Sequence, residues 1–417
     1  MRRSTIHQNW VWGLLLVAMA SFVPPAFAKD RWDSGLKEEW EQYQETPEAK
    51  AYDEAYEQWQ AKLAEALRSH EQPIIRVFGS LMVTGRDFEA KYSVERQEIR
   101  RRALQDGWND PRILLIVYTH DCIRNHRAEW CDAVEVREQF RRADPNNAVG
   151  VLLPLLFPGE YIDTYSLTPE LETTLLEAAG QDYFFLYHGA GAYDAYLIVK
   201  DFSETHPLPK LPAQAADLLE RSEYGWDEMM FFRPTMAVSS ASGHVTHVGW
   251  LHTLCKEARE LQRQAVFDAC LRITRLMQSH PRSEISAGIG HGAELRLLYP
   301  DHQRANDEQN QSASWRSQLR TLVEECKRPP LIASNRYGLM PAGYWPQYLK
   351  DLQEVGESMA LERAAQREYA LNPEEFTMNP GDCEGIYDLD EETQKKMAIE
   401  GEIRRLDKVL ETMGEEP

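Results

Sequence analysis

Basic residues are scarce in this chain, and so are long apolar runs. Lysine and arginine together number 46, whereas aspartate and glutamate number 67, and the formal net charge is −21. Nucleic acids and anionic membrane surfaces are bound by clustered lysine and arginine. The deficit of basic residues therefore argues against nucleic acid as a partner, and it favours solubility or attraction to a basic protein.

The short motifs that mark common catalytic sites are also missing. The sequence has no Gly-x-Ser-x-Gly, no His-Glu-x-x-His, no Gly-x-x-x-x-Gly-Lys-Ser/Thr and no Cys-x-x-Cys. These patterns would mark a hydrolase nucleophile, a zinc helix, a phosphate-binding loop or a redox-active thiol pair. Without them the sequence predicts no catalytic residue, no cofactor and no metal, and we expect a protein that is not an enzyme.

The first 28 residues have the pattern of a secretory signal peptide. Arg2 and Arg3 precede an apolar stretch over 10–23, and two prolines then lead to Ala26-Phe27-Ala28. Small residues at the first and third places of that triplet fit a signal peptidase, which predicts cleavage after Ala28. The apolar stretch is shorter than the ~20 residues of a membrane-spanning helix. We expect a periplasmic or secreted protein with no stable membrane insertion after cleavage.

Six cysteines follow the predicted signal peptide. An even number of cysteines in an exported protein favours disulfides, because oxidising compartments preserve them. We predict three disulfides, which pair the cysteines in chain order: Cys122 with Cys131, Cys255 with Cys270, and Cys326 with Cys383.

The first cysteine pair lies in a predicted helical hairpin. A helix over 112–123 and a second helix over 128–142 flank a polar break at 124–126, and Cys122 and Cys131 lie on either side of it. In an antiparallel hairpin these positions face each other, so the disulfide is geometrically reasonable. The buried seam of the hairpin is predicted at Leu114, Leu115, Tyr118, Val134 and Phe140.

The second pair makes a sharper claim about the chain path. On one continuous helix, Cys255 and Cys270 would lie about 22 Å apart and no bond would form. Apolar residues recur at helical spacing over 237–260 and over 264–277, while the residues between them are polar. We therefore predict a reverse turn near 261–263. The third pair, Cys326 with Cys383, is predicted by elimination and ties the tail to the body.

Two stretches place aspartate before proline where a helix is expected to begin. Asp110-Pro111 has the chemistry of a helix N-cap followed by proline at the first helical position, and it returns at Asp144-Pro145. The two prolines are 34 residues apart, which equals the period of a tetratricopeptide unit.

The Asp-Pro-Asn-Asn-Ala junction at 144–148 resembles the turn between tetratricopeptide-like repeats. The cysteine-linked hairpins are similar to those of exported helical-repeat proteins of bacteria. The resemblance covers about 108–157 and recurs at Leu371-Asn372-Pro373-Glu374. It implies an α-solenoid that binds other proteins or peptides without catalysis.

The expected fold is all-α: a stack of helical hairpins, like a tetratricopeptide solenoid with degenerate repeats, held by disulfides. Further helices are predicted over 33–70 with a break near Thr46-Pro47, over 167–179, over 348–368 and over 390–413. The predicted organisation is a signal peptide (1–28), an N-terminal helical segment (29–105), tetratricopeptide-like hairpins (106–202), a second helical region (203–330) and a C-terminal irregular segment with a terminal helix (331–417).

The leading functional hypothesis is a non-catalytic exported protein that offers a surface to a protein or peptide partner. One alternative is an α/β periplasmic enzyme, because 73–78, 113–118 and 149–157 are apolar enough to be buried strands, with 128–142 as a crossover helix. Another is a metal-binding periplasmic protein, because His244 and His247 would share one face of a helix and imidazole pairs at that spacing bind transition metals.

Overall fold

The computed structural model describes residues 34–82, 93–123, 128–157, 166–187, 191–221, 249–279 and 344–371, with short pieces between 290 and 322 and between 373 and 400. Every regular element in these ranges is a helix. The nearest approach to a sheet there is a single bridge between Asn147 and Tyr183. The expected all-α class is therefore confirmed for the described residues.

The three segments considered as buried strands are helices, which corrects the α/β alternative. Residues 73–78 lie in α4, 113–118 run from α6 into a π-helical turn, and 149–157 lie in α8 and its C-cap. Short apolar runs do not distinguish a buried strand from a buried helix by periodicity alone. The residues at or just before the start of each run indicate a helix: Pro73 and Pro111 occupy first helical positions, and Asn147 caps a third helix.

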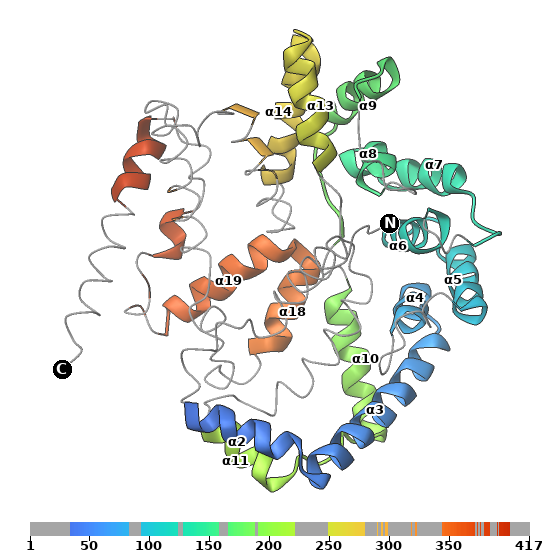
Figure 1. Ribbon diagram of the computed structural model, residues 1–417, viewed down its shortest axis with the longest axis vertical. Helices are drawn as coiled ribbons and strands as arrows, with labels where there is room; N and C mark the ends of the chain where they lie inside the picture. The colour runs from blue at the N-terminus through green and yellow to red at the C-terminus, as the bar shows by residue number, and fades with distance from the viewer. Residues whose placement is uncertain are drawn as a thin grey trace, which may run out of the picture.

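Seven helices from α3 to α9 follow one another along a curve, which we call the arc (Figure 1). From α3 to α8 each packs mainly on the helices next to it in the sequence. Helix α9 packs on α8 and also on a helix much later in the chain, and α2 packs on α3 at the beginning of the curve. The bounds are α2 Ser34–Gln44, α3 Pro47–Arg68, α4 Pro73–Leu81, α5 Val94–Asp106, α6 Pro111–Val117, α7 Ala133–Ala143, α8 Ala148–Leu156 and α9 Pro169–Ala179.

Side-chain caps begin several of these helices where the sequence predicts them. The hydroxyls of Thr46 and Thr168 accept hydrogen bonds from the backbone N–H groups three residues later, and proline follows each threonine. The carboxylate of Asp110 accepts from the N–H of Arg112 in the same way. Each cap satisfies a donor that the first helical turn leaves without a partner. The predicted break at Thr46-Pro47 is thus confirmed.

The first predicted hairpin is right in its pairing and wrong at the start of its second helix. Its first helix ends as a π-helical turn, Tyr118–Cys122, and its second begins at Ala133 rather than at 128. The reason is Asp132, whose carboxylate caps the N–H groups of Val134 and Glu135. Val134 consequently lies on the outer side, 60% exposed, whereas the other four residues of the predicted seam are buried.

The second aspartate–proline pair does not begin a helix. Asp144 ends α7, its N–H bonding to the carbonyl of Phe140, and α8 begins three residues after Pro145, with Asn147 as its cap. Asn147 has the better-placed oxygen, because it accepts from the N–H of Val149. The spacing of 34 residues between the two prolines therefore does not join equivalent positions.

Helix α10, Ala192–Thr205, lies inside the arc and packs against its first long helix (Figure 1). Trp59 of α3 is buried and donates from Nε1 to the carbonyl of His206 at 2.6 Å. Its ring meets Phe202 edge-on at 5.6 Å. Gly191 has φ of +101° where the chain enters α10, and a Cβ there would lie 3.1 Å from the ring of Phe78. The contacts of Trp59 hold α10 against the arc, and Gly191 permits the close approach of Phe78.

The second disulfide hairpin agrees with its prediction. Helices α13, Gly249–Glu260, and α14, Gln264–Ser279, are antiparallel neighbours, and α14 packs on α9 of the arc. Gln262 adopts φ of +59° in the turn between them. The Cα atoms of Cys255 and Cys270 lie 5.9 Å apart and the disulfide is formed. The part of the predicted first helix before residue 249 lies outside the described residues.

Near the C-terminus, one predicted helix over 348–368 is two helices. α18, Tyr344–Val355, and α19, Glu357–Tyr369, pack on each other and are separated by Gly356 at φ of +85°. A residue with a Cβ would be strained in that backbone conformation, so glycine permits the break. Two shorter elements pack on helices already described: α11, Ala213–Arg221, packs on α2, and a 3₁₀ turn at Pro380–Cys383 packs on α19.

In the ranges that the structure describes, no helix combines the length and the apolar character that crossing a membrane requires. The predicted signal peptide lies outside those ranges, as do Cys326 and the part after residue 400 of the helix predicted over 390–413. Residues 392–400 of that helix are helical, as predicted.

Candidate functional site

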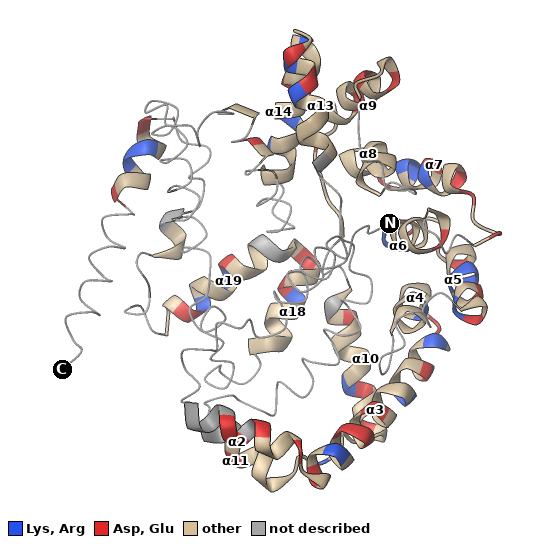
Figure 2. Ribbon diagram, viewed as in Figure 1, with Lys and Arg blue, Asp and Glu red and all other residues tan. Residues whose placement is uncertain are grey.

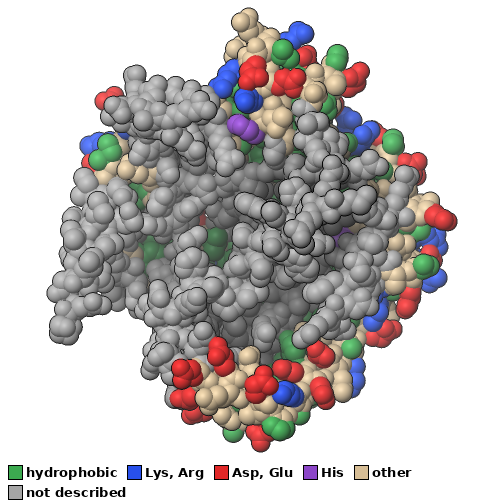
Figure 3. Space-filling model, viewed as in Figure 1, with side chains coloured by type: hydrophobic (Ala, Val, Ile, Leu, Met, Phe, Trp, Pro, Cys, Tyr) green, Lys and Arg blue, Asp and Glu red, His purple; other side chains and the backbone are tan. Residues whose placement is uncertain are grey.

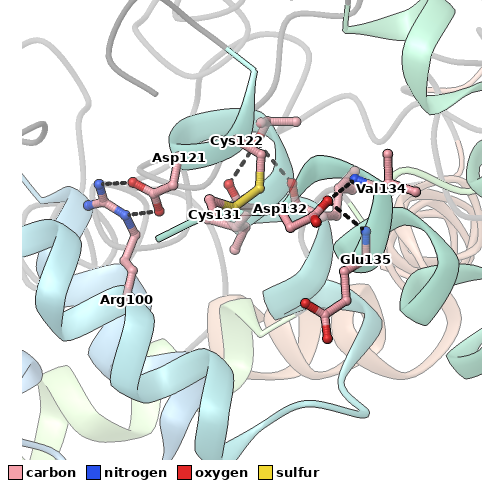
Figure 4. The surroundings of a disulfide bond; sticks show 10 residues. Arg100, Asp121, Cys122, Cys131, Asp132, Val134 and Glu135 are labelled. Atoms are coloured by element: carbon pink, nitrogen blue, oxygen red, sulfur yellow. Dashed lines mark hydrogen bonds and ion pairs between the residues drawn. A yellow bond between two sulfur atoms is a disulfide. The ribbon is translucent and has the colours of Figure 1, made fainter. Parts of the chain in front are cut away.

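Three helices of the arc meet at the first disulfide (Figure 4). Cys122 ends the π-helical turn, and Cys131 lies just before the cap of α7; their Cα atoms are 5.1 Å apart and both residues are buried. The N–H of Ala128 donates to the carbonyl of Asp121 at 2.7 Å. The disulfide and this hydrogen bond close the loop between α6 and α7 at its base.

Beside the disulfide lies a fully buried ion pair. Arg100 of α5 binds both carboxylate oxygens of Asp121, from Nε and from Nη2, each at 2.6 Å, and neither side chain is exposed. Nη1 of Arg100 also donates to the hydroxyl of Ser80 at 3.3 Å. Burial raises the pKa of Asp121, and the guanidinium of Arg100 opposes that rise. This pair has no access to solvent, so it joins α4, α5 and the π-helical turn rather than forming a binding site.

Solvent does reach a polar pocket at the C-terminal end of α7. The pocket has a volume of about 390 Å³ and lies between α7, the turn into α8, and α9. Charged side chains of both signs line it, with one apolar residue from α8. The lining residues are Glu138, Arg141, Arg142, Asp144, Pro145, Asn147, Val151, Glu177 and Gln181.

One wall of the pocket is a buried carboxylate with several donors. Asp144 accepts hydrogen bonds from the hydroxyls of Tyr183 and Tyr187 and from Nδ2 of Asn147. Tyr187 has φ of +57°, a conformation that is uncommon for a residue with a side chain. Its burial and its bond to Asp144 raise the pKa of Tyr187 well above its usual range. The carboxylate is thereby fixed and the segment 183–187 is joined to the α7–α8 turn.

The two arginines of the pocket differ in what they bind. Arg141 forms ion pairs with Glu138 on its own helix and with Glu177 of α9, across the pocket. Arg142 is exposed, and its Nε donates to Oε1 of Gln139 at 3.0 Å. Its two Nη atoms have no partner among the described residues. Arg142 therefore offers donors to a carboxylate, a carbonyl or a phosphate that enters the pocket.

The chemistry of this pocket suits binding. It presents carboxylates, guanidiniums and the Gln181 amide side by side, which is the mixture that hydrogen-bonds the backbone and the polar side chains of a polypeptide. Among the residues that the structure describes, no group of three histidine, cysteine, aspartate or glutamate side chains is placed to hold a metal ion.

The structure places some of the predicted residues and leaves others outside its range. It joins Cys122 to Cys131 and Cys255 to Cys270 as predicted. The predicted pair Cys326–Cys383 is not tested, because Cys326 falls outside the described residues, as do the histidines of the metal hypothesis, His244 and His247. Sequence reasoning missed the pocket, because Asp144 was interpreted as a helix cap.

No protein-family model matches the chain, and neither a curated protein nor a solved structure was found to be similar to it. The resemblance to tetratricopeptide-like proteins therefore stays a prediction, and the functional argument rests on the chain itself.

Proposed function

We propose that this protein is a non-catalytic, exported helical protein that binds a protein or peptide partner. The observation that carries the proposal is the order of packing: from α3 to α8 each helix contacts chiefly its neighbours in the sequence, while α9 packs on both α8 and α14. Helices stacked in sequence order build a long surface instead of closing around a single central cavity, and proteins with such stacks are commonly binding scaffolds. A tetratricopeptide-like solenoid is the form of this stack that we propose.

Export is the second part of the proposal. The signal peptide over residues 1–28, with cleavage after Ala28, would deliver the chain to the periplasm or the exterior. Two disulfides within the described ranges support this location, because disulfides persist in oxidising compartments and are rare in the cytosol.

Charge indicates the chemistry of the partner. Acidic side chains gather over α2 and α3 at the lower edge of the molecule (Figure 3). Over residues 38–57 the exposed acids are Glu38, Glu39, Glu41, Glu45, Glu48, Asp53, Glu54 and Glu57, against one exposed base, Lys50. Such a surface attracts a partner with exposed lysine and arginine and raises the rate of association at low salt.

The polar pocket is the proposed contact for specific recognition. Arginines and glutamates alternate along α7, in contrast to the acidic α2 and α3 (Figure 2). Arg142 is the pocket residue whose terminal donors are unused by other described residues, so a partner's carboxylate or backbone carbonyl would bind there.

Co-purification from the cell envelope tests the proposal. The mature chain with an affinity tag is compared with an Arg142→Glu variant, and bound proteins are identified by mass spectrometry. Arg102→Glu is the matched control, because Arg102 is an exposed arginine of the arc that pairs with Glu98 outside the pocket. We expect one partner to be lost from Arg142→Glu and retained by the control.

Two results would contradict the proposal in different ways. Equal capture of that partner by both variants would remove the pocket from the binding surface. If no protein is enriched over an unrelated acidic protein of the same compartment, the binding function itself is wrong.

A further inference from the structure

One wall of the polar pocket beside α7 has completed its hydrogen bonds within the protein. Asn147 donates from Nδ2 to Asp144 and to the carbonyl of Phe185, each at 2.9 Å. Its Oδ1 accepts from the N–H groups of Val149 and Phe185. Asp144 also accepts from two tyrosine hydroxyls. Asn147 and Asp144 therefore fix the shape of the pocket and leave ligand binding to its other residues.

The donors left over in the pocket belong to Arg142. Its Nε donates to Gln139, whereas its two Nη atoms have no partner among the described residues. Arg141, by contrast, is held by ion pairs with Glu138 and Glu177. A guanidinium with unused Nη atoms matches the geometry of a carboxylate, which it binds through two parallel hydrogen bonds. The pocket therefore has a place for one carboxylate group.

Acceptors are left over at the C-terminal end of α9. Glu177 uses one carboxylate oxygen for Arg141, and its second oxygen binds no other described residue. The Gln181 amide donates from Nε2 to the carbonyl of Glu177 at 3.3 Å, and its oxygen likewise accepts from no described residue. An ammonium group has three donors and no acceptor, so it fits a place that offers only oxygens.

The size of the pocket limits its ligand to a small molecule. The volume of about 390 Å³ lies near the lower end of the range for small-molecule sites, roughly 300–1,000 Å³. At about 30 Å³ for each water in the liquid, this is room for roughly a dozen waters. Pro145 and Val151 are the lining residues without polar side-chain atoms, so they offer a contact to a short apolar group.

We propose that the pocket binds a free α-amino acid with an aliphatic side chain. Its carboxylate binds the Nη atoms of Arg142, and its ammonium group binds the unused oxygens of Glu177 and Gln181. Its side chain lies against Val151. This inference goes beyond the proposed binding of a protein, because the amino acid occupies the pocket without one and competes with a partner's carboxylate for Arg142.

Titration calorimetry of the purified protein with L-leucine tests the proposal. N-acetyl-L-leucine lacks the ammonium charge, L-leucinamide lacks the carboxylate, and L-glutamate has a charged side chain in place of the aliphatic one. Arg142→Ala removes the site for the carboxylate. Arg102→Ala is the matched control, because Arg102 is an exposed arginine of α5 that pairs with Glu98 outside the pocket. Circular dichroism checks that both variants are folded.

We expect L-leucine to bind with a dissociation constant below about 10 mM, which even a modest ligand of its size reaches. Arg142→Ala should weaken this binding by about 10–100-fold through the loss of charged hydrogen bonds, and Arg102→Ala should leave it unchanged. The three other ligands should each bind more weakly than L-leucine.

Three results would overturn the proposal. They are the absence of L-leucine binding at about 10 mM, equal affinity in Arg142→Ala and the unchanged protein, and equal affinity for any of the other three ligands. No protein partner enters the titration, so its failure would leave the co-purification experiment to decide the proposed function separately.

Discussion

The arc and the pair of helices α18 and α19, which we call the C-terminal hairpin, each bury an aspartate, but the two aspartates are paired with arginine differently. Asp121 and its partner Arg100 are both 0% exposed. Asp351 is 3% exposed, while its partners Arg363 and Arg367 are 41% and 33% exposed. If Asp121 is lost, the guanidinium of Arg100 stays buried without access to water. If Asp351 is lost, Arg363 and Arg367 can still be hydrated, because both are partly exposed. The same arginine–aspartate chemistry therefore matters more for the stability of the arc, where both partners are buried, than for that of the hairpin, where the arginines are partly exposed.

The largest expected effect comes from removing the carboxylate of the arc. Asp121→Ala leaves Arg100 buried and unpaired, and we expect the free energy of unfolding to fall by about 3–5 kcal/mol. Asp351→Ala should cost about 1–2 kcal/mol, because Arg363 and Arg367 can turn to solvent. Urea unfolding followed by circular dichroism measures both. Equal losses would remove the distinction between the two regions.

A double substitution sharpens this prediction. Replacing Arg100 with methionine and Asp121 with leucine removes both charges, and we expect it to recover most of the stability lost in Asp121→Ala. A double variant that is as unstable as the single one would mean that packing, and not an unpaired charge, causes the loss.

Disulfides give the next largest effect. Changing Cys255 and Cys270 to serine should lower the free energy of unfolding by about 3 kcal/mol. The same change at Cys122 and Cys131 should lower it by about 2.5 kcal/mol, because that disulfide closes a shorter loop. Adding a reductant to the unchanged protein is the control. The C-terminal hairpin should keep its amide protection in both variants; if it loses protection with the arc, the two regions unfold as one.

A smaller effect is expected in the C-terminal hairpin. Gly356 lies at φ of +85° and ψ of 173°, a region that residues with a side chain rarely adopt. Gly356→Ala should therefore cost about 1–3 kcal/mol, and hydrogen exchange should increase in α18 and α19 while α4 and α8 are unchanged. Faster exchange across the arc as well would mean that the strain at Gly356 is not confined to the hairpin.

The smallest effect is expected on the exposed side of α5. Hydrogen bonds from Arg101 and Arg102 lower the pKa of Glu98 to about 2. Because the pKa is lowered in the folded state, this carboxylate stabilises the fold above its ordinary pKa of about 4.3, and the contribution is lost as the pH falls toward 2. An NMR titration of labelled glutamate measures the midpoint, and a Glu98 midpoint near 4.3 would contradict the paired geometry.

Local chemistry made part of the fold predictable. Thr46, Asp110 and Thr168 cap helices because their side chains reach N–H groups two or three residues away, and the sequence contains everything that this geometry needs. The turn between Cys255 and Cys270 was predictable for a similar reason, since a disulfide across 15 residues requires a reversal. The start of α7 was predicted five residues too early, at 128, although Asp132 followed three residues later by Glu135 has the pattern of a capping box.

The pocket depends on residues that are far apart in the sequence. Asp144 reads as a helix cap until Tyr183 and Tyr187, 39 and 43 residues later, donate to it. Nothing near Asp144 indicates those donors. The pairing of Arg100 with Asp121 likewise depends on how α5 packs beside the π-helical turn, which helical periodicity does not specify.

The bond between Trp59 and His206 has a consequence for how the chain acquires its structure. It joins residues 147 positions apart, and at ~5–20 residues per second a ribosome needs about 7–30 seconds to add that length. During this interval the indole of α3 has no α10 to cover it, so a nascent or translocating chain presents an unfinished hydrophobic surface to chaperones and proteases. The hydrogen bonds between α18 and α19, by contrast, join residues 12 to 24 positions apart, so they can form soon after those residues emerge.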